Sequence, residues 1–176
     1  MFSWRCLSKH PVLVPSNPQS RFKLIYVNPD DFLGNPRVFT LERNQEAWRS
    51  CKDLAETTLT ETTDRYNYYV VCGIQGSGKT HWVNENRAVF LEPALVFDAA
   101  LPRARDRAGA VAQGRRFSCR LICIWISCPL DMALARNRAR PHDQVIEDEV
   151  VRFVFNNFEP PTLAEGFDEV VKIESL

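Results

Sequence analysis

Residues 73 to 80 read Gly-Ile-Gln-Gly-Ser-Gly-Lys-Thr, a complete G-x-x-x-x-G-K-[ST] pattern. The glycines of such a pattern let backbone N–H groups turn inward around a phosphate group. The lysine reaches the β- and γ-phosphates of a nucleoside triphosphate, and the final hydroxyl ligates Mg²⁺. The sequence therefore predicts a site for ATP or GTP with magnesium. The residues expected to contact the nucleotide are Gly73, Gln75, Gly76, Ser77, Gly78, Lys79 and Thr80.

Two other places carry side chains suited to phosphate chemistry. Asp98 ends an apolar run and could orient Thr80 or a magnesium-bound water, or it could only cap the next helix. Arg136 and Arg140 are four residues apart in a predicted helix over 131–140, so both could project toward a triphosphate. The alternative interpretation of these arginines is a solvated basic helix.

The segments around the glycine pattern favour a nucleotide site. Residues 68–72 before it are β-formers, and residues 81–86 after it can begin a helix. A strand, a glycine loop and a helix in succession are the context in which this pattern binds phosphate. The alternative is a glycine-rich turn with a chance lysine.

Bulk composition excludes several classes of protein. The 176 residues suffice for one domain with a sizeable core, and the formal net charge is +0, so a polyanion site would have to be a local patch. No apolar run could span a bilayer and the first 20 residues do not resemble a secretion signal, so we expect a cytoplasmic protein without membrane contact. The six cysteines form no C-x-x-C pair and are expected to be buried, reduced thiols.

Strand and helix patterns alternate along the chain. This alternation predicts an α/β protein with a three-layer P-loop NTPase fold, a parallel sheet of about five strands and helices on both faces. Residues 21–176 are expected to form this single domain, and residues 1–20 an irregular arm. The predicted strands are 22–27, 68–72, 94–98, 121–127 and 169–173, and the predicted helices are 44–60, 81–86, 103–113 with Gly114 as its stop, 131–140 and 144–158.

The second half of the chain resembles the polynucleotide 5′-hydroxyl kinases, a branch of the P-loop kinases. Residues 94–98, followed by Pro-Arg-Ala-Arg at 102–105, look like that family's strand-end aspartate and helix start. Residues 129–141 resemble its arginine lid, and the string Phe-Glu-Pro-Pro-Thr-Leu-Ala-Glu-Gly-Phe-Asp at 158–168 looks very like its C-terminal signature. The resemblance covers residues 68–176 and implies an ATP- and Mg²⁺-dependent kinase that phosphorylates the 5′-hydroxyl of DNA or RNA.

One departure from that family concerns the order of its parts. The family's acceptor strand, which carries the general base, follows the helix after the phosphate loop, but residues 81–93 are too few to hold it. Residues 26–31, Tyr-Val-Asn-Pro-Asp-Asp, look like the missing strand end, and they precede the loop. Because parallel crossovers are right-handed, each helix keeps its usual face in this shuffled order. The resemblance then places strand 94–98 between strands 22–27 and 68–72; the alternative is an unrelated N-terminal extension.

The resemblance assigns the general base to Asp30, with Asp31 as the nearby alternative. From the residues alone, Asp30 could instead be a turn aspartate after Pro29. The arginine that usually follows the base, where it grips a substrate phosphate, is replaced by Phe-Leu-Gly at 32–34. The basic residues available elsewhere are Arg37, Arg43, Arg103, Arg105 and Arg107.

Three functional interpretations remain open at this point. The first is a kinase of polynucleotide 5′-hydroxyl ends. The second is a kinase of a small hydroxyl compound, because the Asn-Pro-Asp string at 28–30 also resembles zeta-toxin-like kinases, which phosphorylate a nucleotide sugar. The third is a non-enzymatic ATP-binding module whose acceptor site has lost its catalytic activity. A turnover assay separates the third from the first two.

Overall fold

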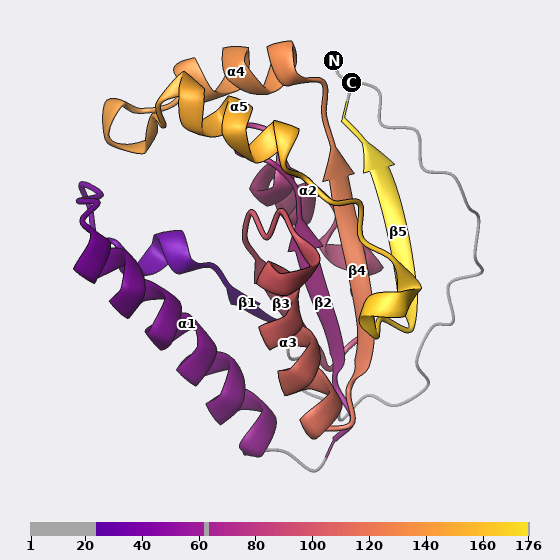
Figure 1. The fold of residues 1–176 in the computed structure, drawn as a ribbon. Helices are drawn as coiled ribbons and strands as arrows, with labels where there is room; N and C mark the ends of the chain where they lie inside the picture. Colours follow the sequence, from indigo (N-terminus) through magenta and orange to yellow (C-terminus); the bar gives the residue numbers. More distant parts are fainter. Residues whose placement is uncertain (1–23, 62–63, 176) are drawn as a thin grey trace.

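The computed structural model describes residues 24–61 and 64–175, and the strands in these residues form one parallel sheet (Figure 1). The strand order is β1-β3-β2-β4-β5, and every neighbouring pair is parallel. The expected irregular arm over residues 1–20 lies outside the described residues. The strands are β1 (Leu24–Val27), β2 (Asn67–Cys72), β3 (Ala94–Asp98), β4 (Arg120–Ser127) and β5 (Glu169–Glu174).

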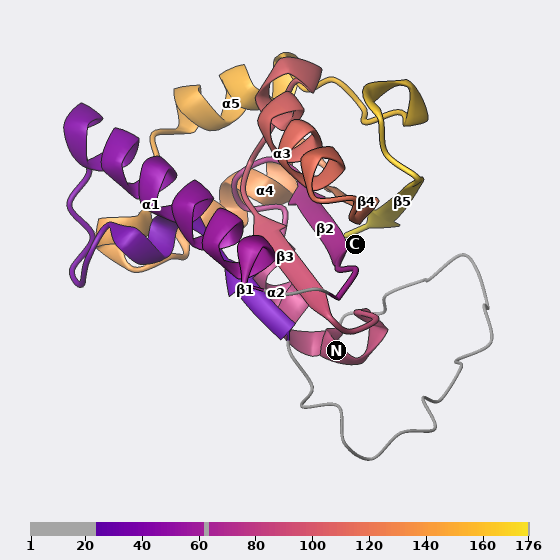
Figure 2. The same ribbon diagram turned by 90° about the horizontal axis from the view of Figure 1, so that it is seen from below.

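Helices cover both faces of the sheet, as Figures 1 and 2 show from two directions. Helices α1 and α3 pack on one face, whereas α2 packs on the other. Helices α4 and α5 lie across the carboxyl ends of the strands (Figure 1). The helices are α1 (Leu41–Thr60), α2 (Lys79–Glu85), α3 (Ala104–Arg116), α4 (Leu130–Arg138) and α5 (Asp148–Asn156), with short 3-10 turns η1 (Pro29–Phe32), η2 (Arg87–Val89), η3 (His142–Gln144) and η4 (Leu163–Glu165).

The central strands are buried on both sides, as a parallel sheet between helical layers requires. All five residues of β3 are buried, and so are five of the six residues of β2. One side of the core joins Phe97 to Cys51 and Ala55 of α1, and the other joins Val96 to Trp82 of α2. This explains why both strands read as unbroken apolar runs in the sequence.

The predicted strand order is confirmed. Strand β3 pairs with β1 on one side and with β2 on the other, so the strand of residues 94–98 does lie between its two predicted neighbours. The chain therefore enters the sheet at its edge, crosses to β2 through α1, and returns one place to β3 through α2. Residues 24–60 form part of the same sheet and core, and they are not a separate extension.

Several predicted helix limits were wrong. Helix α1 begins at Leu41 and not at residue 44, because Thr40 caps it, and α5 (Asp148–Asn156) is shorter than the predicted 144–158. Helix α3 runs through Gly114 to Arg116, because Gly114 lets the helix approach the sheet closely. A Cβ at Gly114 would lie only 2.5 Å from a methyl carbon of Leu121 and 3.0 Å from the ring of Tyr68. Helix α4 ends at Arg138 and not at residue 140, because a residue that precedes a proline avoids the helical conformation.

The C-terminal signature at residues 158–168 makes contacts that hold the fold together. Arg107 is fully buried, and its guanidinium forms an ion pair with Glu165 at 2.6 Å. Asp168 accepts from the backbone N–H of Leu121 at 2.8 Å, which joins the signature to the start of β4. Gly166 turns the chain between them with φ +102°, a conformation that favours glycine.

The described residues bear on two further expectations, one about the state of the cysteines and one about membrane-spanning helices. Cys51, Cys72, Cys119, Cys123 and Cys128 are all buried free thiols, whereas Cys6 lies outside the described residues. None of the helices in residues 24–61 and 64–175 has the length and apolar character needed to cross a membrane.

Candidate active site

The segments that follow β1, β2 and β3 meet at the carboxyl edge of the sheet, where parallel α/β proteins bind their ligands. The glycine-rich loop (residues 73–78) follows β2, η1 follows β1, and Asp98 ends β3 between them. The predicted nucleotide residues and both candidate carboxylates are therefore at one edge.

The backbone of the glycine-rich loop lies very close to α4 on one side and to β4 on the other. A Cβ at Gly76 would lie 2.1 Å from the carbonyl oxygen of Ala133 in α4, and the φ of Gly76 is +78°. A Cβ at Gly73 would lie 2.5 Å from the carbonyl oxygen of Ile126 in β4. Only glycine fits at these two positions. Ile74 packs with Ala133 and Cys128, so α4 holds the loop in place.

Lys79 begins α2, and its side chain turns back over the loop. Its Nζ donates to the carbonyl oxygens of Gly73 at 2.9 Å and Ile74 at 3.1 Å. Burial lowers the pKa of Lys79, and the negative charge of Asp98 opposes this shift. An ammonium group held at the mouth of a glycine-rich loop suits the binding of phosphate oxygens.

Several polar groups of the loop have no protein partner. Within the described residues, the backbone N–H groups of Gly76 and Gly78 donate to no acceptor. Gln75 Oε1 and Ser77 Oγ are buried and have no hydrogen-bond partner there either. Buried polar groups are normally paired, so this concentration in one loop marks a place adapted to a polar ligand.

Asp98 is fully buried and joins the glycine-rich loop to β1. Its Oδ2 accepts from the hydroxyl of Thr80 at 2.8 Å and from the hydroxyl of Tyr26 at 2.7 Å. Asn28 Nδ2 donates to the Tyr26 oxygen at 2.9 Å. Burial raises the pKa of Tyr26, and the Asp98 charge raises it further, so Tyr26 stays a neutral donor.

The pair of Thr80 and Asp98 fits a magnesium ion that a triphosphate also coordinates. Mg²⁺ prefers oxygen ligands and usually keeps several waters and phosphate oxygens beside one or two protein groups. The second carboxylate oxygen, Asp98 Oδ1, is buried and has no hydrogen-bond partner among the described residues. No group of three or more acidic, histidine or cysteine ligands occurs in that part of the chain, so the pair would not hold a metal ion alone.

The Asp98 network makes a prediction about stability. Asp98→Ala is expected to lower the free energy of unfolding by about 2–3 kcal/mol, because the half-buried Tyr26 and the more exposed Thr80 both lose a charged hydrogen-bond acceptor. Tyr26→Phe removes only one of these bonds and should lower it by about 1 kcal/mol. Urea denaturation measures both values, and an Asp98→Ala variant as stable as the wild type would contradict the network.

Asp30 lies in η1, where its charge acts on two basic groups of the candidate site. Its negative charge acts on Lys79 and on Arg140, where it opposes the burial that lowers the pKa of each. Asp30 Oδ2 accepts from Arg37 Nη1 at 2.9 Å, and the Asp30 side chain is 51% exposed. The side chain of Asn28 caps η1 by accepting from the Asp30 N–H at 2.9 Å.

Arg37 fills the position beside Asp30 that the sequence seemed to leave without an arginine. The chain turns after η1, and this turn returns Arg37 to the carboxylate. The backbone N–H of Arg37 donates to Asp143 in η3 at 2.8 Å, so this segment also contacts the loop that follows α4.

Asp31 is the second carboxylate of η1. Partial burial raises its pKa, the nearby Arg37 lowers it, and the charges of Asp30 and Asp98 raise it further. A carboxylate with a raised pKa is a stronger base, so the structure keeps Asp31 beside Asp30 as a candidate general base.

Arg136 and Arg140 do not share a helix face, which corrects the expectation from their spacing. Arg140 lies beyond the end of α4, in the field of Asp30, Arg37 and Asp98, and burial lowers its pKa. Arg136 remains in α4 and donates to Ser175 Oγ at 2.6 Å, past the end of β5. The structure therefore brings Arg140 to the carboxylates, whereas Arg136 contacts the C-terminal segment.

Arg140→Ala tests the position of Arg140 near the carboxylates. The variant is expected to lower the rate of phosphoryl transfer by about 10²-fold while ATP affinity changes much less, because a cation placed at developing charge acts mainly on the transition state. Arg138→Ala is the matched control, since Arg138 is exposed and pairs with Asp148. Steady-state kinetics with ATP as the varied substrate measures kcat and KM. A change confined to KM, or an equal effect of Arg138→Ala, would refute this role.

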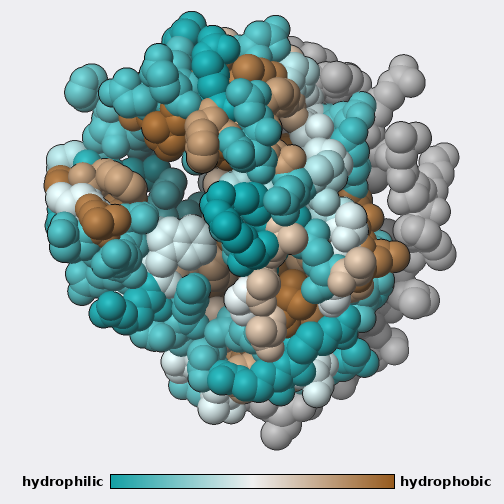
Figure 3. All heavy atoms as spheres, in the orientation of Figure 1, coloured by the Kyte–Doolittle hydropathy of each residue, from teal (hydrophilic) through white to brown (hydrophobic). Residues whose placement is uncertain are grey.

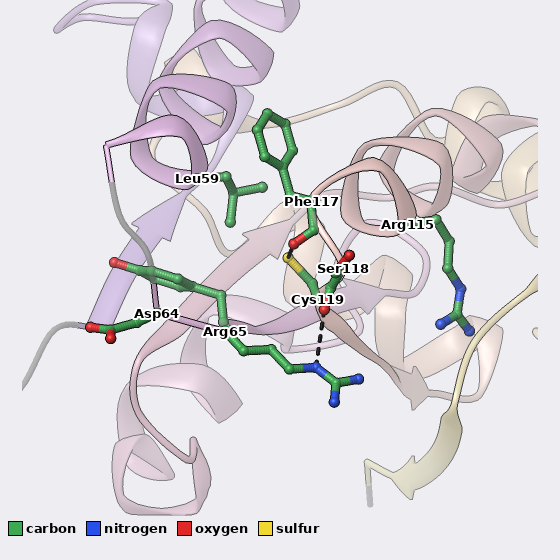
Figure 4. A pocket seen from close by; sticks show the side chains of 8 residues that line it. Leu59, Asp64, Arg65, Arg115, Phe117, Ser118 and Cys119 are labelled. Carbon is green, nitrogen blue, oxygen red and sulfur yellow. Dashed lines mark hydrogen bonds between the residues drawn. The ribbon is translucent and has the colours of Figure 1, made fainter.

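A separate cavity lies at the opposite edge of the sheet, near the amino ends of β2 and β4 (Figure 4). Its volume is about 620 Å³. Arg65 Nε donates to the Ser118 carbonyl oxygen at 3.0 Å, and Arg115 donates to Gly166 and Asp168. Because both cations are already engaged and the cavity is remote from Lys79, we exclude it from the candidate active site.

Comparison with known proteins adds no family assignment. No protein-family model matches this chain, and no curated protein shows significant sequence similarity to it.

Sequence reasoning missed the role of Tyr26. The signal was present in the spacing, because Tyr26 and Asn28 are two residues apart and point to the same face of β1. The register pairs Tyr26 with Val96, which brings Asn28 level with Asp98. That register could not be read before the pairing of β1 with β3 was known.

Proposed function

We propose that this protein is an ATP- and Mg²⁺-dependent phosphotransferase that transfers the γ-phosphate of ATP to an alcohol group, the 5′-hydroxyl of a polynucleotide. The observation that carries the proposal is the strand order β1-β3-β2. This order brings Asp30 to the same edge as Lys79 and Thr80, with Asp98 between them. A nucleotide-binding loop after β2 would not by itself require two further carboxylates, Asp30 and Asp31, at the end of β1.

Each side chain then has a distinct role. ATP bound at the glycine-rich loop would supply the phosphoryl group, and Mg²⁺ held by Thr80 and Asp98 would neutralise charge on its oxygens. Lys79 donates to phosphate oxygens at the loop. Asp30 orients the attacking hydroxyl and accepts its proton, and Arg140 stabilises the charge that develops during transfer. Arg136 acts at most indirectly, through the C-terminal segment that it contacts.

Arg37 supports a polynucleotide as the acceptor. In the polynucleotide kinases that this chain resembles, an arginine usually follows the base and grips a substrate phosphate; here Arg37 Nη1 lies 2.9 Å from Asp30 Oδ2. A guanidinium can bind a phosphate with two parallel hydrogen bonds. The small-molecule alternative depends on the Asn-Pro-Asp string alone.

The experiment is a transfer screen with γ-labelled ATP and Mg²⁺. The acceptors are a 5′-hydroxyl DNA oligonucleotide, a 5′-hydroxyl RNA oligonucleotide and a set of sugar nucleotides. We expect label on the oligonucleotides. Label on a sugar nucleotide alone would establish the small-molecule alternative, and binding of ATP without transfer to any acceptor would leave only the nucleotide-binding module.

A further inference from the structure

A groove runs between α1 and α3 on one face of the sheet. It is lined along both helices, from the segment after β3 to the end of α3, and its volume is about 800 Å³. Trp48 of α1 forms part of its wall, with its ring centroid 6.0 Å from that of Phe97. Figure 3 shows a hollow in the surface between the areas over α1, α5 and the start of α3, where this groove reaches the carboxyl edge.

The charge of the groove lining is positive although the whole chain is neutral. The lining contains four cationic side chains and two carboxylates, a net charge of +2. Arg103 pairs with Asp106 at 3.0 Å, and Arg116 pairs with Glu56. Arg105 also lies 4.0 Å from Asp106, which it shares with Arg103, and its side chain is 72% exposed. The four cations therefore exceed the two carboxylates by two. Such a local patch attracts a polyanion.

Gly109 lies in the middle of α3 on the wall of this groove. A Cβ there would have no atom within 4 Å, so no packing contact excludes a larger residue. Glycine in a helix interior is less stable than any non-proline residue. Its presence keeps the groove wide at the centre of α3, where a side chain would otherwise project into it.

The groove opens next to the candidate active site. Ala100 and Leu101, at the upper end of the lining, follow β3 directly. The carbonyl oxygen of Ala100 accepts from the N–H of Gly73, the first residue of the glycine-rich loop, at 3.1 Å. A chain leaving Asp30 and Asp98 can therefore enter the groove without crossing the protein.

We propose that the α1–α3 groove binds a single strand of nucleic acid, and specifically the nucleotides on the 3′ side of the phosphorylated end. The placement of these nucleotides beside the phosphorylated hydroxyl rests on the proposed function. Lys52 and Arg105 contact the phosphodiester backbone, and Trp48 offers a ring against which a base stacks. Positive grooves with aromatic side chains are the usual sites for single strands, because every base has a face that stacks.

The test uses a 12-nucleotide oligo-dT with a 5′-hydroxyl and a 3′-fluorescein, and fluorescence anisotropy measures its affinity. Gly109→Glu should weaken binding by about tenfold or more, because it places a bulky anion in the groove. Gly109→Ala is the matched control and should bind like the wild type. Both variants should melt no lower than the wild type, since each residue favours the helix more than glycine does. Arg105→Ala should reduce the slope of log affinity against log salt by about 0.7.

The outcomes separate this inference from the proposed function. Loss of oligo-dT binding in Gly109→Glu supports the groove, even if no transfer to any acceptor is detected, in which case the proposed function alone fails. Normal turnover of a 3′-mononucleotide by Gly109→Glu, with weakened turnover of the 12-mer, supports both. The inference is overturned if the wild type does not bind oligo-dT, if Gly109→Glu binds it normally, or if poly-glutamate competes as well as unlabelled oligo-dT.

Discussion

Lys79→Ala is expected to reduce phosphoryl transfer by about 10²- to 10³-fold and to remove the stabilisation that ATP gives to the folded protein. The physical reason is the position of the ammonium group, which two loop carbonyls hold at the mouth of the glycine-rich loop. Alanine keeps the helix and removes the charge that phosphate oxygens would contact. In the wild type, ATP at about 100 times its Kd should raise the melting temperature by roughly 5–10 °C.

The measurement combines thermal melting with and without Mg²⁺-ATP and a transfer assay. Lys172→Ala is the control, because Lys172 lies in β5, where it pairs with Glu174 away from the loop. Without ATP, the melting temperature of Lys79→Ala should stay close to that of the wild type. Undiminished transfer by Lys79→Ala would remove the glycine-rich loop from the mechanism.

Asp30→Asn is expected to retain ATP binding and to lower turnover by about 10²-fold or more, the usual contribution of a general base. The amide keeps the shape of the side chain and one hydrogen-bond acceptor but cannot take the proton. The charge of Asp30 acts on Lys79 and Arg140, and the backbone of η1 remains capped by Asn28, so the local fold should persist.

Asp31→Asn is the matched control for this substitution and should have a milder effect. Single-turnover kinetics separates the chemical step from product release for both variants. If Asp31→Asn is the inactive variant, the loss of activity identifies Asp31 as the base, and Asp30 is then a partner of Arg37. If neither variant loses activity, no base acts from η1, and Asp98 becomes the candidate.

The strands were the part of the fold that the sequence predicted best. All five residues of β3 are buried and the first four are apolar, so the pattern is strong and the limits of the strand were predicted correctly. The strand order was also predicted correctly, but from the resemblance to the polynucleotide kinases; the right-handed crossover rule showed only that the shuffled order of the parts is compatible with it.

Helix ends were less predictable because they depend on contacts between distant residues. Gly114 was expected to stop α3, but the nearness of Leu121 and Tyr68 requires a glycine inside the helix. The spacing of Arg136 and Arg140 suggested one face, yet Pro141 ends the helix before the second arginine. In both cases a residue outside the helical pattern, either in a neighbouring strand or just after the helix, determined where the helix ends.

The candidate site was predictable where its residues are consecutive and was not where they are brought together by folding. The glycine-rich loop could be identified from eight successive residues. The contacts of Asp98 with Tyr26 and of Asp30 with Arg37 depend on strand register and on the turn after η1. Neither can be deduced from spacing alone.

The most direct test of the proposed function is where the label of γ-labelled ATP appears when a 5′-hydroxyl oligonucleotide is the acceptor. We predict that the wild type places the label on the 5′ end, where a phosphatase removes it, and that Asp30→Asn does so about 10²-fold more slowly under single-turnover conditions. Absence of label from every oligonucleotide and small hydroxyl acceptor, at ATP concentrations that saturate the protein, would contradict the proposal that this protein is a phosphotransferase.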